Sequence, residues 1–371
     1  MTDRPSVGFF RRDIEGLRGI AILFVLLMHV QFPAADGILF PRGYIGVDIF
    51  FVISGYLITS ILTRPDPRPI WSRLSEFYAN RIVRLAPALI VTVSLVMSFS
   101  VFPHAASTVS DDAADAIATL FYVENFRMVQ QSLAGVDINS SPWPFSHAWS
   151  LGVEAQFYLL FAPLMLLLTK LRSRSALLWL SVISLPVAWL VSTSALPGYM
   201  LLLLPGRLVP LVVGAGIALL PPVRGRAAAV AAAAGLAALI ALLFGCVPSL
   251  PSLITPILAA ILIAPAIWRA EASDVLSRIL ESRPLRFLGR ISYSLYLWHW
   301  PIVGAFSGDG LKLTVERSLT IIGLSVLAAA ISRKVIEEPF LRAKDRERRK
   351  IAIACVLITV LLALELSTIA G

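Results

Sequence analysis

Two ionisable residues, Arg18 and His29, lie in the first apolar run of the chain, GLRGIAILFVLLMHVQF at positions 16–32. Their spacing corresponds to about three turns of an α-helix, so both side chains share one helix face, about 16 Å apart along the axis. Charged groups are costly in hydrocarbon unless they face a polar interior. Both residues are therefore candidates for function.

Further ionisable residues lie in later apolar runs. His147 and Glu154 in SHAWSLGVEAQFY are two helical turns apart, and with His29 and with His299 of YLWHWP they are predicted to converge. A histidine beside a carboxylate suits acyl transfer to an alcohol, because imidazole accepts a hydroxyl proton near neutral pH and the carboxylate fixes its tautomer. The pair also suits a proton relay in a transporter, and each residue alone is explained equally well by hydrogen bonding inside a bundle.

The segment 64–84 concentrates positive charge, with arginines at Arg64, Arg68, Arg73, Arg81 and Arg84. Guanidinium groups bind phosphates bidentately, so a phosphorylated donor such as coenzyme A would find ligands here. Basic loops on the cytoplasmic side of a membrane follow equally from topology alone.

The elements that must position these residues are membrane helices. The chain is 57% hydrophobic and 15% charged, with a mean hydropathy of +0.81, which excludes an ordinary soluble domain. We predict an all-α polytopic membrane bundle of about ten core transmembrane helices plus an eleventh at the carboxyl terminus. The expected spans are 16–32, 44–63, 85–103, 148–169, 176–194, 199–220, 227–247, 250–268, 287–306, 316–333 and 351–370.

The distribution of basic residues predicts the orientation of the bundle. With a cytoplasmic amino terminus, most of the 32 Lys and Arg residues fall on the cytoplasmic side, and the carboxyl terminus lies outside. The net charge of +9 is thereby explained without a nucleic-acid partner. The long connection 104–147 falls outside and is predicted to be an acidic, partly helical cap where a polar substrate could meet the protein.

Several blocks together resemble the acyltransferase-3 family of bacterial integral-membrane O-acyltransferases. These blocks are DIEGLRGIAILFVLLMHV, GVDIFFVISGYLI, FYANRIVRLAPAL, HAWSLGVEAQFYLL, FLGRISYSLYLWHWPI and EEPF, in the family's order. The resemblance implies a membrane acyltransferase domain over 1–340. It implies that 341–371 is a basic linker and an additional helix, which in relatives leads to an extracytoplasmic domain.

The resemblance implies transfer of an acyl group, by default acetyl, from cytoplasmic acetyl-CoA as donor substrate to a hydroxyl of an extracytoplasmic glycan or glycolipid, in the bacterial inner membrane and without a metal. By the family's motifs, His29 and Glu154 are the catalytic candidates, and Arg18, Arg81 and Arg84 the donor-binding candidates. The remaining candidates, for acceptor binding or lining of the site, are His147, His299 and Arg207.

Two positions depart from the family's pattern. Ala155 stands where a second glutamate is common, and Pro210 stands where an acid often follows Arg207. Arg207 is therefore expected to pair elsewhere, with Glu154 as one partner.

Three questions stay open at the level of sequence. Direct transfer and an acyl intermediate on His29 are both chemically reasonable. A proton-coupled transporter or flippase is the alternative function, although no internal repeat supports it. The acceptor and the oligomeric state are not specified.

Overall fold

A computed structural model of the chain describes residues 11–34, 37–100, 106–136, 144–170, 203–246, 254–269, 274–306 and 314–370. Within these ranges the chain is helical apart from loops, an isolated bridge and one short antiparallel hairpin, β1 (Pro33–Ala34) with β2 (Gly37–Ile38). The predicted all-α fold class is therefore confirmed. The expected span 176–194 lies outside the described residues.

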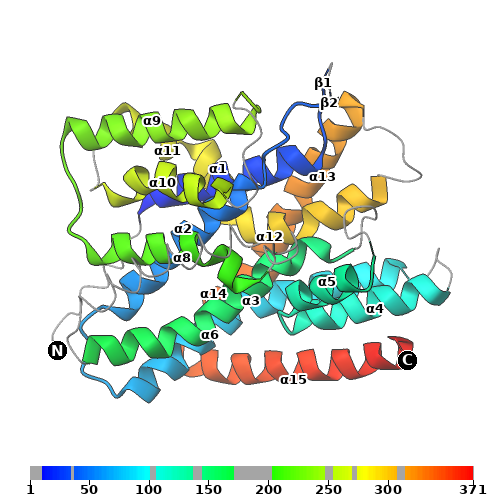
Figure 1. The fold of residues 1–371 in the computed structure, drawn as a ribbon. Coiled ribbons are helices and arrows are strands. Elements are labelled where there is room, and N and C mark those ends of the chain that lie inside the picture. Colours follow the sequence, from blue (N-terminus) through cyan, green and yellow to red (C-terminus); the bar gives the residue numbers. More distant parts are fainter. Residues whose placement is uncertain are drawn as a thin grey trace.

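The long helices lie side by side across the molecule, and α15 follows one edge against α3 and α4 (Figure 1). The helices are α1 (Arg12–His29), α2 (Ile45–Leu62), α3 (Ile70–Ser100), α4 (Ala106–Leu120), α5 (Glu124–Leu133), η1 (Ser146–Ala148), α6 (Trp149–Lys170), α8 (Leu204–Leu219), α9 (Arg226–Leu243), α10 (Ile254–Trp268), α11 (Val275–Leu280), α12 (Arg283–Phe306), α13 (Val315–Ser332), η4 (Arg333–Glu337), α14 (Glu338–Leu341) and α15 (Asp345–Ala370).

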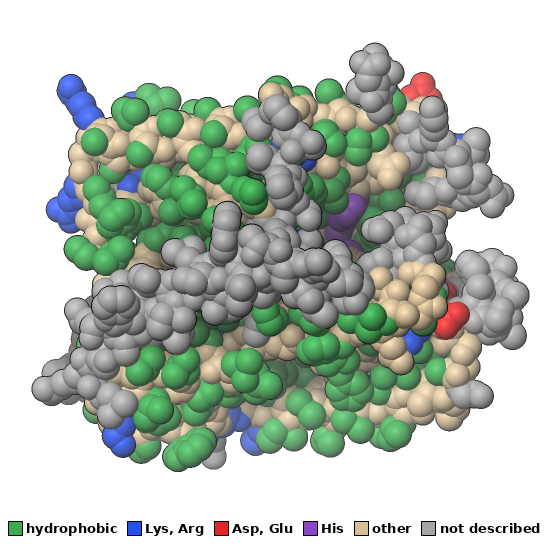
Figure 2. All heavy atoms as spheres, in the orientation of Figure 1, with side chains coloured by type: hydrophobic (Ala, Val, Ile, Leu, Met, Phe, Trp, Pro, Cys, Tyr) green, Lys and Arg blue, Asp and Glu red, His purple; other side chains and the backbone are tan. Residues whose placement is uncertain are grey.

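Six helical segments of the described chain are long and apolar enough to cross a membrane: Ile45–Leu62, Ile70–Phe99, Ser146–Lys170, Arg226–Leu243, Val315–Leu341 and Glu347–Ala370. Two shorter apolar helices, Arg207–Leu219 and Ile254–Trp268, accompany them. Among the coloured side chains on the face seen in Figure 2, hydrophobic ones are the most common. These features are those of a multi-pass membrane protein, and the expected number of about eleven spans stays a prediction.

The arginine-rich segment and the third span form one continuous helix, α3. The sequence analysis separated the basic segment 64–84 from a span that begins at 85, whereas α3 continues through this boundary. Pro87 lies inside α3, and its missing N–H does not end the helix because a proline within a bundle is tolerated where neighbouring helices support the backbone. Arg81 and Arg84 are consequently held on the same helix that enters the core.

Close helix contacts fix the arrangement of the helices that carry the site. A Cβ atom at Gly289 of α12 would lie 1.8 Å from the carbonyl oxygen of Glu15 on α1. A Cβ atom at Gly55 of α2 would lie 1.9 Å from the carbonyl oxygen of Leu211 on α8. Small residues allow helix backbones to approach this closely in membranes. Both crossings therefore require glycine.

The connection 104–147 contains α4 and α5, which confirms the prediction of a partly helical acidic segment. Arg127 of α5 forms an ion pair with the buried Asp115 of α4. Glu124 at the start of α5 is only 1% exposed. Burial, together with the nearby charge of Asp115, raises the pKa of Glu124 well above its ordinary value.

Candidate active site

A cavity lies between α1, α2, α3, α6 and α12. Its lining combines three arginines, one carboxylate and several hydroxyl groups: Arg18, Arg81, Arg84, Glu154, Ser54, Ser150, Tyr158, Ser292, Tyr293 and Tyr296. Aromatic and aliphatic side chains such as Phe50 and Leu57 complete the wall. The structure thus brings all three predicted donor-binding arginines to one cavity, which we name the arginine cavity.

The arginines of this cavity are held by their neighbours. Arg18 donates to Oγ of Ser292 at 2.7 Å, and its guanidinium carbon lies 5.6 Å from the ring centre of Phe50. The guanidinium of Arg81 lies 4.8 Å from the ring centre of Tyr158. Contacts with aromatic faces orient a guanidinium while leaving its charge in place.

Glu154 belongs to the arginine cavity, and the predicted pairing of Glu154 with His29 is not what the structure shows. Its carboxylate accepts hydrogen bonds from the hydroxyl groups of Ser54 and Tyr158. His147 lies in the 3-10 turn η1, which runs directly into α6, the helix that carries Glu154.

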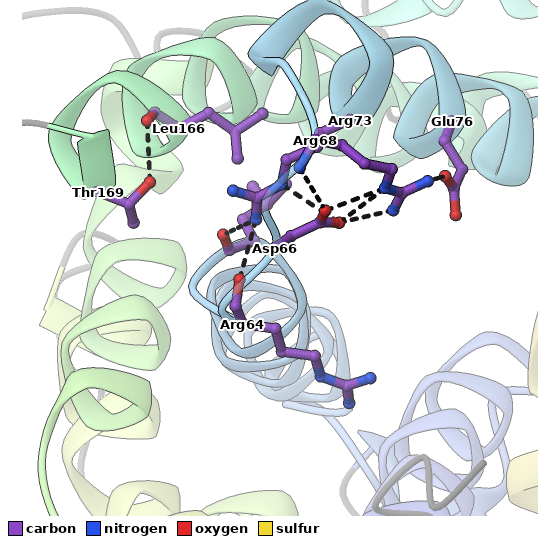
Figure 3. A network of polar contacts seen from close by, with 8 residues as sticks. Arg64, Asp66, Arg68, Arg73, Glu76, Leu166 and Thr169 are labelled. Carbon is purple, nitrogen blue, oxygen red and sulfur yellow. Dashed lines mark hydrogen bonds and ion pairs between the residues drawn. The ribbon is translucent and has the colours of Figure 1, made fainter. Parts of the chain in front are cut away.

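A second and larger cavity adjoins the first and shares Arg81 and Arg84 with it. At its rim, Arg68 pairs with Asp66 at 2.6 Å and with Glu76, as Figure 3 shows. Hydrogen bonds from Arg68 lower the pKa of Asp66 to about 2, so this carboxylate is charged at neutral pH. We name this space the basic cavity.

Three histidines meet at the end of α1. Nδ1 of His29 lies 3.0 Å from Nε2 of His299, and the two rings are stacked at 5.1 Å. The ring of His147 lies 5.4 Å from that of His299, edge to face. Trp300 packs against His29 at 4.7 Å. The structure therefore brings His29, His147 and His299 together, while Glu154 faces the arginine cavity.

Hydrogen bonding assigns the proton positions of the two contacting imidazoles. Nδ1 of His299 lies 3.0 Å and 2.8 Å from the carbonyl oxygens of Leu295 and Tyr296, which only accept, so this nitrogen carries hydrogen. With both rings neutral, Nε2 of His299 accepts a hydrogen bond from Nδ1 of His29. The lone pair of His29 is then on Nε2, where it can accept a proton.

Tyr296 separates the arginine cavity from the histidines. Its hydroxyl lines the cavity, lies 2.6 Å from Oγ of Ser150 and donates to the backbone carbonyl of His147 at 2.6 Å. His147 is buried, with an exposed fraction of 6%, and its ring packs against those of Tyr296 and His299.

The partner of Arg207 is Asp48, and the predicted pairing with Glu154 is wrong. Nη1 of Arg207 lies 2.9 Å from Oδ1 of Asp48, whose side chain is fully buried. The indole of Trp149 lies 5.1 Å from the guanidinium. In this chain Pro210 stands where an acid often follows Arg207, and Asp48 provides the carboxylate instead. Asp48 reaches Arg207 because α2 packs against α8.

Several residues of the site were missed by the sequence analysis. Ser292, Tyr158 and Asp48 carry hydrogen bonds or ion pairs to the predicted arginines and to Glu154. Of these, Asp48 had a usable signal, because an acidic residue inside an apolar run is itself a candidate for function. In the described part of the chain, no group of three or more His, Cys, Asp or Glu side chains is arranged to hold a metal.

Comparison with known proteins gives a family and relatives. Residues 11–333 match the acyltransferase domain family. The peptidoglycan O-acetyltransferase OatA of Listeria monocytogenes is 32% identical over 352 residues, which cover 88% of this chain and 55% of that protein. The O-acetyltransferase OatA of Staphylococcus aureus is 30% identical over 355 residues, covering 88% and 56% respectively.

The chain spans about half the length of the curated relatives it matches. No solved structure matches it.

Proposed function

The chain belongs to the acyltransferase family whose domain its residues 11–333 match, and from this premise we propose that it is a membrane O-acetyltransferase of the cell envelope. The names of its relatives support acetyl as the group transferred and a peptidoglycan or related glycan as the acceptor. The membrane is the bacterial inner membrane, with a cytoplasmic amino terminus, as the distribution of basic residues indicates.

The observation that carries the proposal is the placement of Arg18 and His29 on one helix. Arg18 lines the arginine cavity, and His29 ends the same helix within the histidine cluster. An acyl donor bound among the arginines and an acceptor bound at the histidines would thus both lie beside α1. We propose acetyl-CoA as the donor, because guanidinium groups bind its phosphates and the arginine cavity can receive its thioester.

His29 acts as the general base in this mechanism. Nε2 of His29 takes the proton from the acceptor hydroxyl, whose oxygen attacks the thioester carbonyl carbon. The carbon–sulfur bond breaks, the thiolate leaves as coenzyme A, and the proton held on His29 returns to the sulfur directly or through solvent. His299 accepts from Nδ1 of His29 and so holds the base in the productive tautomer.

Access of the acceptor is supported by the exposure of the histidine cluster. His29 is partly exposed, whereas His147 and His299 are buried. Figure 2 shows a histidine side chain at a recess of the surface. We propose that His147, whose ring packs against that of His299, helps to place the acceptor near the base.

The experiment is mass spectrometry of cell-envelope glycans from cells expressing the wild type, His29→Ala or Arg12→Gln. Arg12 is exposed at the start of α1 and serves as the matched control for expression and membrane insertion. We expect a gain of acetyl mass with the wild type and Arg12→Gln, and none with His29→Ala. Equal acetylation by His29→Ala would refute the mechanism, and transport without consumption of acetyl-CoA would favour a transporter.

A further inference from the structure

The basic cavity has a wall that lies outside the matched acyltransferase domain. Arg348 lies near the start of α15, beyond residue 333 where the family match ends, and it lines this cavity. Six arginines and two carboxylates line the cavity in total, an excess of four positive charges. The arginines are Arg64, Arg68, Arg73, Arg81, Arg84 and Arg348.

Hydrogen bonds hold the side chain of Arg348 of α15 beside α3 and α14. Its Nη1 donates to Oδ1 of Asn80 on α3 at 2.9 Å. Its Nε and Nη2 donate to the carbonyl oxygens of Ala343 and Leu341, which follow and end α14, at 3.0 Å and 3.1 Å. Asn80 is one helical turn before Arg84 on α3 and also lines the basic cavity. The start of α15 is thereby held beside the arginines of the family motif.

The division of the space into two cavities separates the two ends of the donor. Tyr296 lines the arginine cavity, and its ring lies 5.5 Å from that of His299, so we assign the thioester end of the donor to this cavity. Arg81 and Arg84 line both cavities, and beyond them the basic cavity offers the larger space and the greater positive charge. The phosphorylated nucleotide is the large, strongly anionic part of coenzyme A.

We propose that Arg348 of α15 is a further ligand of the nucleotide phosphates of acyl-CoA, beside the arginines of α3 that line the basic cavity. This inference rests on the proposed function. It makes the segment 341–371 a part of the donor site, although that segment follows the acyltransferase domain. Asp66 and Glu76, which pair with Arg68, hold that arginine at the rim until a phosphate competes for it.

The test compares a donor fragment that has phosphates with one that lacks them. Binding of coenzyme A and of S-acetylpantetheine, which has no phosphate, is measured by calorimetry on the full chain in lipid nanodiscs. Arg348→Gln is expected to weaken binding of coenzyme A about tenfold, as for loss of one charge-assisted contact, and to leave S-acetylpantetheine unaffected. Arg349→Gln is the matched control, because Arg349 is the next residue of α15 and is exposed.

A second variant distinguishes loss of the phosphate contact from a change in folding. Arg348→Lys keeps the charge but loses the planar fork, so intermediate affinity for coenzyme A is expected. The inference would be overturned if Arg348→Gln bound coenzyme A as tightly as the wild type does. It would also be overturned if Arg348→Gln and Arg348→Lys both lost affinity for coenzyme A and for S-acetylpantetheine to the same extent. If the wild type bound neither probe, the proposed function itself would fail.

Discussion

Nδ1 of His29 on α1 and Nε2 of His299 on α12 lie 3.0 Å apart, and the other nitrogen of His299 is bonded to backbone carbonyls. A histidine therefore stands where a carboxylate orients the base in many hydrolases. A neutral imidazole accepts one hydrogen bond and fixes the tautomer, but it stabilises a protonated base less than a carboxylate does. The pair therefore suits a general base that holds the proton of the acceptor only briefly.

We expect His299→Ala to lower kcat about 100-fold, a typical contribution of a positioned acid–base group, while leaving KM for acetyl-CoA unchanged. His299→Gln should recover part of the loss, because its side-chain oxygen can accept from Nδ1 of His29. Steady-state kinetics on purified variants separate kcat from KM. A change in KM alone would place His299 in substrate binding and remove it from orientation of the base.

How much of this site the sequence predicts depends on whether a relationship is local. Arg18 and His29 share one helix, so their spacing alone placed them along a common face. The pairing of His29 with His299 depends on α1 packing against α12, and the contact of Glu154 with Ser54 depends on α2 packing against α6. Helical periodicity carries no information about such crossings.

Asp48 shows a different limit. It lies in the block GVDIFFVISGYLI, which served in the sequence analysis only to support the family resemblance. In the structure, Ser54 of the same block donates a hydrogen bond to Glu154. The ion pair of Asp48 with Arg207 was not foreseen, because it depends on the packing of α2 against α8, and Glu154 was expected as a partner instead.

We expect Asp48→Asn to lower the free energy of unfolding by about 3–5 kcal/mol, because it leaves the buried Arg207 without a compensating charge. Adding Arg207→Met should restore most of that loss, since the uncompensated charge is then gone. Thermal unfolding in detergent, followed for the single and double variants, measures the coupling. Additive losses would show that the two side chains do not stabilise each other.

We expect Gly55→Ala to destabilise the protein by about 2 kcal/mol or more, because its new Cβ would meet the backbone of Leu211 and separate α2 from α8. Gly323 of α13 is the matched control, since a Cβ there meets nothing within 4 Å. Gly323→Ala should be neutral or stabilising by up to about 1 kcal/mol. Membrane abundance and unfolding temperature report both effects, and equal behaviour of the two variants would contradict the close crossing.

Because the pKa of Glu124 is raised, we expect the stability of α4 and α5 to depend on pH. Its pKa is raised in the folded state by burial and by Asp115, so the folded protein holds a proton that the unfolded chain releases at lower pH. Stability is therefore fully present below the ordinary glutamate pKa, and it decreases as pH rises toward the raised value, by up to about 1.4 kcal/mol per pH unit. Hydrogen exchange of α4 and α5 between pH 5 and 8 measures this change.

The variant Glu124→Gln provides the control for that pH dependence. It removes the titrating group, so the opening free energy of α5, obtained from exchange rates corrected for the intrinsic effect of pH, should become nearly independent of pH and exceed that of the wild type at pH 8. If the wild type and Glu124→Gln respond equally to pH, another group is responsible. Asp115 is the first to examine, because burial also raises its pKa.

Arg18 offers a direct test of donor binding in the arginine cavity. We expect Arg18→Gln to raise KM for acetyl-CoA about tenfold, because one charge-assisted contact is lost, and Ser292→Ala to have a smaller effect because it removes only the hydrogen bond that orients Arg18. Arg12→Gln, on the same helix but exposed, should match the wild type. A lower kcat with constant KM in Arg18→Gln would instead show that the guanidinium acts on the transition state, as a group stabilising the charge on the thioester oxygen would.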